Sequence, residues 1–162
     1  EGITIGDSLL DFFSKNEIDK NLRNFYKNKN FLVTLLPTLR KDSMYEYIQV
    51  HFRKGDDKYI VYSIDGLIDI DIKECIKLQT EVVNSISDMF TNIKKDGPST
   101  IKHQGDPSGK STSIHFEWRF NNYDNIEVVC YDFVKPMEWP DGLNVAIAKR
   151  ELLEWLVNDA YN

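Results

Sequence analysis

The sequence contains few of the residues that would assign it to a known class of site. There are only two cysteines and three histidines among 162 residues, without a Cys-x-x-Cys pair or a Cys/His cluster, so the pattern indicates no metal site and no cofactor. No apolar run approaches the ~20 residues of a membrane-spanning helix. Basic residues are also in deficit, with 20 Lys and Arg against 26 Asp and Glu and a formal net charge of -6. We therefore expect a soluble, acidic protein that neither spans a membrane nor binds nucleic acid.

What is present is an ordinary globular composition, with 41% hydrophobic and 12% aromatic residues, and we expect a single domain over residues 1–162. Helical spacing of apolar residues predicts helices at 9–13, 15–26, 71–92 and 149–160, with a capping box at Ser14 and a cap at Asp71. Alternating apolar and polar residues predict strands at 45–53, 59–64, 113–120, 126–133 and 143–148. Residues 94–112 are rich in Lys, Asp, Gly, Pro and Ser and are predicted to be loop.

The order of these elements predicts an α+β fold. Consecutive strands joined by short turns pair antiparallel, and we expect a sheet of four to five strands in the order α-α-β-β-α-β-β-(β)-α. The strands alternate cleanly, which is typical of a sheet with one covered face and one solvated face. All helices are therefore predicted to pack on the same face of the sheet.

Two short strings resemble catalytic motifs. Gly6 to Leu9 resembles the first block of GDSL (SGNH) hydrolases, in which Ser8 would be the nucleophile, but no histidine follows an Asp-x-x-His pattern and no Gly-x-Asn-Asp block is present. We therefore expect Asp7 or Ser8 to cap a helix, and a small serine esterase using Ser8 is kept as an alternative function. Gly105 to Thr112 resembles a P-loop, but its glycines are one residue too close and a strand follows it, so a polar loop is expected.

The two cysteines are both predicted to point into the core. Cys75 lies on the apolar stripe of the predicted helix at 71–92, and Cys130 shares a strand face with Ile126 and Val128. A disulfide is sterically possible if the Cα atoms come within ~7 Å, and two buried free thiols are the alternative.

The face predicted to be solvated collects polar and titratable side chains. The predicted strands at 45–53 and 59–64 form one hairpin, and those at 113–120 and 126–133 form another. If the two hairpins are neighbours, this face forms a patch that contacts a protein partner or a small-molecule ligand. The alternative is an ordinary solvated face with cross-strand ion pairs. Our candidate binding residues are His51, His115, Glu117 and Arg119, with Glu127 and Tyr131 on the same face.

The chain also resembles a group of uncharacterised small exported proteins from marine bacteria with AT-rich genomes. The resemblance is carried by the strings from Ile3 to Ile18, from Asp71 to Cys75 and from Val129 to Asp132. It implies a periplasmic or secreted location, which a start at Glu1 rather than Met would fit if a signal peptide had been removed. Export favours a Cys75–Cys130 disulfide. The predicted function is a non-enzymatic binding or envelope-associated domain, with an immunity- or inhibitor-type protein that binds a basic partner as a further alternative.

Overall fold

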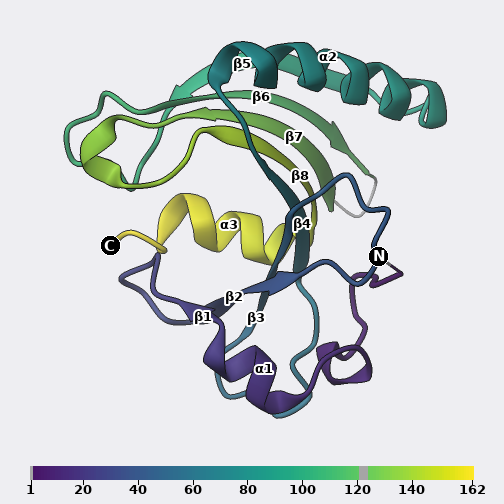
Figure 1. The fold of residues 1–162 in the computed structure, drawn as a ribbon, viewed down its shortest axis with the longest axis vertical. Coiled ribbons are helices and arrows are strands. Elements are labelled where there is room, and N and C mark those ends of the chain that lie inside the picture. The colour runs from purple at the N-terminus through teal and green to yellow at the C-terminus, as the bar shows by residue number, and fades with distance from the viewer. Residues whose placement is uncertain (1, 121–123) are drawn as a thin grey trace. The chain divides into compact units, whose positions relative to one another are not determined.

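The computed structural model describes residues 2–120 and 124–162. Over these residues it contains eight antiparallel strands and three α-helices (Figure 1). The helices are α1 (Lys15–Lys20), α2 (Ile72–Met89) and α3 (Arg150–Asn158). The strands are β1 (Leu22–Arg23), β2 (Phe31–Pro37), β3 (Tyr47–Arg53), β4 (Ser63–Asp69), β5 (Lys95–Lys102), β6 (Thr112–Arg119), β7 (Asn125–Asp132) and β8 (Gly142–Ala148). Single 3-10 turns lie at Leu9–Asp11 and Lys135–Met137.

The strands follow the order β1-β2-β3-β4-β8-β7-β6-β5 in the sheet. The chain divides into two compact units, which are described separately below. Unit 1 comprises Glu1–Gly66 and Ile147–Asn162, and unit 2 comprises Leu67–Ala146. Both β4 and β8 run from one unit into the other. Among the described residues no helix is long and apolar enough to cross a membrane.

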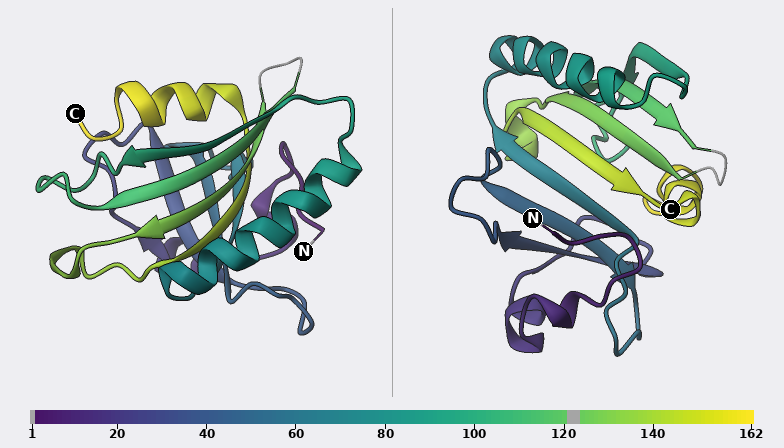
Figure 2. Two further views of the ribbon diagram at one scale, coloured as in Figure 1. Left: turned by 90° about the horizontal axis from the view of Figure 1, so that it is seen from above. Right: turned by 90° about the vertical axis from the view of Figure 1, so that its right-hand side faces the viewer.

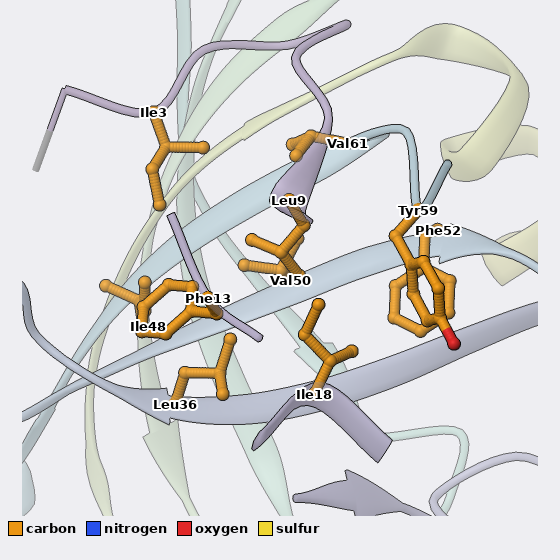
Figure 3. Close-up of a cluster of buried hydrophobic side chains, with 10 residues drawn as sticks. All are labelled: Ile3, Leu9, Phe13, Ile18, Leu36, Ile48, Val50, Phe52, Tyr59 and Val61. Atoms are coloured by element: carbon orange, nitrogen blue, oxygen red, sulfur yellow. The ribbon is translucent and has the colours of Figure 1, made fainter. Parts of the chain in front are cut away.

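Unit 1 buries side chains on both faces of its strands. On one face the N-terminal segment and α1 contribute Leu9, Phe13 and Ile18, which pack against alternate residues of β2 and β3, among them Leu36 and Val50 (Figure 3). The Thr34 hydroxyl on the same face donates a hydrogen bond of 3.0 Å to the carbonyl of Ile18.

The opposite face of unit 1 is covered by α3. Leu152 and Trp155 of α3 cluster there with Phe31, whose side chain points away from α1 because successive side chains of a strand alternate between its two faces. The Phe31 and Trp155 ring centroids are 5.2 Å apart. Helices in unit 1 therefore lie on both faces of the strands.

Unit 2 is built on α2, which packs against one face of its strands (Figures 1 and 2). Asp71 caps this helix by accepting hydrogen bonds from the backbone N–H groups of Lys73 and Glu74, as predicted from its position. Cys75 and Cys130 form a buried disulfide between α2 and β7 with a Cα–Cα distance of 5.9 Å. The predicted pairing of these cysteines is confirmed. The buried Gln79 of α2 also donates hydrogen bonds to strand carbonyls, 2.7 Å to Ile114 and 3.0 Å to Val128.

The predicted fold class is wrong in two respects. The sheet has eight strands rather than four to five, and the helices of unit 1 lie on both faces rather than one. The extra strands are β1, β2 and β5. Strand β2 is a nearly continuous apolar run, because both of its faces are covered, and so it shows no alternation.

Strand β5 lies in the segment that was predicted to be loop from its polar composition. It is an edge strand with mostly exposed residues, so it lacks the apolar alternation of a half-buried strand. Its pairing with β6 shifts between Asp96 and Ser99, and Gly97 lies at this irregularity with φ +112°. A Cβ on Gly97 would lie 2.5 Å from the carbonyl oxygen of His115. Glycine and proline are tolerated at bulges on sheet edges, so the glycine and proline of Lys95–Lys102 are compatible with a strand.

Two further boundaries differ from the prediction. Helix α1 ends at Lys20, and the next residues, Leu22–Arg23, pair with β2 instead of continuing the helix. The strand predicted at 59–64 begins at Ser63. The preceding backbone bonds to the N-terminal segment instead, through Gly6 N to Val61 O and Leu9 N to Tyr59 O.

Candidate functional site

Ser8 does not have the surroundings of an activated nucleophile. Its Oγ donates a 2.7 Å hydrogen bond to the carbonyl of Lys58 and accepts one of 3.3 Å from the N–H of Leu10. Ser8 is thus the cap of the Leu9–Asp11 turn, and the predicted capping role is confirmed. The hydroxyl proton goes to a backbone oxygen and not to an imidazole, which a serine nucleophile requires.

The segment from Gly105 to Ser111 lies in the loop between β5 and β6, as predicted, and Thr112 begins β6. Its backbone amides turn toward the carboxylate of Asp106, which accepts hydrogen bonds from the N–H groups of Ser108, Lys110 and Ser111. The bond from Ser111 is the main reason that the pKa of Asp106 lies well below its ordinary value. Amides that would face a phosphate in a P-loop are therefore already bound to a side chain of the same loop.

His51 lies in unit 1 and is only 2% exposed, so it is not on a solvated face. Its Nδ1 is 2.7 Å from Ser63 Oγ, and its Nε2 is 3.0 Å from the hydroxyl of Tyr26. Ser63 Oγ donates to Asp65 Oδ1 at 3.0 Å, and Gln49 Nε2 donates to the other carboxylate oxygen at 3.0 Å. These five side chains form a hydrogen-bonded relay inside unit 1.

The direction of each bond in the relay follows from the available protons. Ser63 has one hydroxyl proton, which Asp65 accepts, so the bond between His51 and Ser63 must use a proton on Nδ1. Nε2 is then the acceptor for the Tyr26 phenol. Burial lowers the pKa of His51 from 6.5 to about 3, in agreement with a neutral ring. Each of the four hydrogen bonds of the relay therefore has one donor and one acceptor. Together they link β3, β4 and Tyr26.

The other predicted binding residues come together in unit 2. Apolar residues of β6 and β7 face α2, so the alternate residues of these strands face the opposite way. We call this second surface the polar face. Its members are Ser113, His115, Glu117 and Arg119 on β6, and Asn125, Glu127, Val129 and Tyr131 on β7.

His115 and Glu117 are held by near neighbours on β6. His115 Nε2 lies 2.7 Å from Ser113 Oγ, and burial lowers the pKa of His115 below its ordinary value. Glu117 forms an ion pair with Arg119. The Arg119 side chain is 63% exposed and that of Glu117 is 22% exposed, so the guanidinium is accessible while the carboxylate is largely covered.

A row of three carboxylates crosses the polar face. Strand register places Asp96 of β5 opposite Glu117 of β6, and places Glu117 opposite Glu127 of β7. Residues directly opposite in antiparallel strands share a face. All three carboxylates contribute to raising the pKa of Arg119, and the largest cause is the hydrogen bond that Arg119 donates to Glu117. Asp96 was missed in the sequence because its segment was predicted to be loop.

Asn125 completes this region of the polar face. It lies opposite Arg119 in the register of β6 and β7, and it is 3% exposed. Its Nδ2 donates a 3.0 Å hydrogen bond to Glu127 Oε1. Within the described chain its Oδ1 has no hydrogen-bond partner. Asn125 was missed in the sequence, because a residue at the beginning of a strand carries no signal for this role.

A cluster of four rings lies where the loops of unit 2 meet. Tyr131 and Phe133 stack at 5.2 Å with nearly parallel planes, and His103 lies edge-on to both. Trp139 packs against Phe133 at 5.2 Å. All four rings are half-buried. These ring contacts join the loop between β5 and β6 to the segment that follows β7.

Over the described ranges no group of three or more His, Cys, Asp or Glu side chains could hold a metal ion. Comparison of the chain with known protein families, with curated proteins and with solved structures finds no match. The function must therefore be inferred from the residues of the polar face.

Proposed function

We propose that the chain is a non-enzymatic binding domain and that it contacts its partner through the polar face of unit 2. The observation that carries the proposal is the placement of Glu117 directly opposite Glu127, with Asp96 opposite Glu117. Like charges directly opposite each other destabilise a sheet. A surface needed only for folding gains nothing from this arrangement, whereas a surface that binds a positively charged partner does.

The distribution of charge supports a basic partner. Unit 2 contains thirteen Asp and Glu residues against eight Lys and Arg, while unit 1 contains thirteen against twelve. The two units contain equally many acidic residues, but the unit that carries the polar face has fewer basic residues and therefore most of the net negative charge. Complementary charge steers association and selects partners. An immunity- or inhibitor-type role, in which the domain binds a basic protein, is the form of this function that we favour.

We further propose that the domain works in an exported, periplasmic or secreted setting. The Cys75–Cys130 disulfide supports this location, since such bonds persist in oxidising compartments and are rare in the cytosol. The resemblance to small exported proteins, noted from the sequence, supports the same location.

A selection experiment tests the proposed surface without a known partner. Disulfide-intact protein is used to select a phage-displayed random peptide library, and the selected peptides are then assayed on single variants. We expect the selection to yield basic peptides whose binding is weakened by His115→Ala and by Glu117→Ala. The control variant Glu81→Ala, at an exposed acidic position on α2, should bind these peptides as the wild type does. Peptides that bind all three variants equally would show that the polar face is not the contact surface.

A further inference from the structure

The spacing of the carboxylate row limits what kind of cation it can bind. Neighbouring strands lie about 4.8 Å apart, so Asp96, Glu117 and Glu127 on three successive strands spread over about 10 Å between the outer two. Metal ions such as Ca²⁺ need several oxygen ligands at about 2.3–2.6 Å from one point. The row suits an extended group that carries several N–H donors instead of a single ion.

The amide of Asn125 adds an acceptor to the row. Because the Glu127 carboxylate only accepts hydrogen bonds, the Asn125 amide must turn its Nδ2 toward Glu127. This orientation fixes Oδ1 as the remaining atom, and it lacks a partner among the described residues although the side chain is 3% exposed. A buried acceptor without a donor costs stability. A ligand donor at this position would satisfy it.

Arg119 shows how a cation sits at the row. Its guanidinium pairs with Glu117 and is influenced by Asp96 and Glu127 as well. Lys94, whose side chain is 83% exposed, pairs with Asp96 at 2.5 Å at the outer end of the row. Exposed pairs of this kind contribute little to stability, so a ligand cation can displace them at small cost.

We infer that Asp96, Glu117, Glu127 and the Asn125 amide oxygen form a site for an organic cation with several N–H donors, and that Arg119 occupies it when the ligand is absent. The inference rests on the proposed function and names the group that the polar face recognises. Two sources share this chemistry, the Arg or Lys side chains of a basic protein and a small polyamine. Arg119 is then an intramolecular competitor of the ligand.

Two-dimensional ¹H–¹⁵N NMR spectra of the disulfide-intact protein test the site with three probes, a tri-arginine amide peptide, spermidine and CaCl₂. We expect the peptide to shift the signals of β6, β7 and the Asn125 side-chain amide, and its binding to weaken as NaCl is raised. Shifts from the peptide alone would identify a protein side chain as the source, and stronger shifts from spermidine would identify a polyamine. Shifts produced only by CaCl₂ would overturn the inference in favour of a metal site.

Matched variants separate a site from general attraction to an acidic protein. Glu117→Gln and Glu127→Gln should each weaken peptide binding by about threefold or more, while Glu81→Gln and Asp88→Gln on α2 change the net charge equally and should leave it nearly unchanged. Arg119→Gln should tighten binding by about threefold, because it removes the competitor. Equal effects of all four acidic variants, or weaker binding by Arg119→Gln, would overturn the inference.

Failure of the cation site can be distinguished from failure of the proposed binding surface. If none of the three probes shifts the polar face, but library peptides still require His115 and Glu117, the cation site is wrong and the binding surface stands. If those peptides ignore the polar face as well, both proposals fail.

Discussion

The two units use similar strands but cover them differently. In unit 1, α1 and α3 pack on opposite faces of the strands, and five polar side chains form the relay around the buried His51. In unit 2, α2 packs on one face, a disulfide ties it to β7, and the other face carries the carboxylate row. When helices cover both faces, polar residues must satisfy one another. Where one face has no helix from its own unit, they can serve a partner.

The largest effect that we expect comes from the disulfide. Replacing both cysteines, Cys75→Ala with Cys130→Ala, removes a cross-link over a sequence separation of 55 residues and should lower the free energy of unfolding by about 4 kcal/mol. Hydrogen exchange should show the loss of protection first in α2 and β7, with the amides of unit 1 less affected. Equal loss in both units would mean that the units do not differ in what stabilises them.

The second effect is the acid sensitivity of unit 1. His51 stays neutral in the folded protein because its pKa is lowered from 6.5 to about 3, whereas the unfolded chain takes up a proton below pH 6.5. The stability from this group is therefore complete above pH 6.5 and is lost as the pH falls toward 3, by about 3 kcal/mol between pH 7 and pH 4.

Urea unfolding of the wild type and of His51→Gln at pH 7, 5.5 and 4 measures this term. The variant should be less stable at pH 7 but should lose less stability on acidification. His115→Gln is the comparison in unit 2, where burial lowers the histidine pKa in the same direction. Parallel pH profiles for the wild type and His51→Gln would show that the relay histidine is not held neutral.

A smaller effect belongs to the helix cap of unit 2. Asp71→Ala removes the acceptor of two backbone N–H groups at the start of α2 and should cost about 1 kcal/mol of unfolding free energy. Asp71→Asn retains an acceptor and should recover most of this loss in thermal unfolding. Equal losses from both substitutions would show that the cap depends on charge alone.

Helix starts and the faces of the two cysteines could be predicted, because they depend on residues close together in the sequence. Asp71 and the Ser14 capping box mark helix starts that the structure confirms, and the apolar positions of Cys75 and Cys130 were enough to propose their disulfide. The number of strands was not predictable in the same way, because β2 is covered on both faces and β5 is exposed at an edge. Neither strand shows alternating hydrophobicity.

The candidate site was predictable only in part, for a related reason. Alternation along β6 placed His115, Glu117 and Arg119 on one face correctly. His51 was wrongly grouped with them, because the sequence does not show which helix covers β3. Asp96 and Asn125 enter the site through strand register. Register is set by long-range pairing that a single sequence does not display.

The stability of Glu117→Gln and Glu127→Gln tests the central claim most directly, since it needs no partner. Each glutamine keeps an acceptor oxygen but removes a charge from the row, so we predict unchanged or slightly higher unfolding free energy, by up to about 0.5 kcal/mol, in urea at low salt. Such a gain means that the row is maintained for binding at a small cost to folding. A loss of 1 kcal/mol or more in either variant would contradict the account, because the carboxylates would then serve the fold itself.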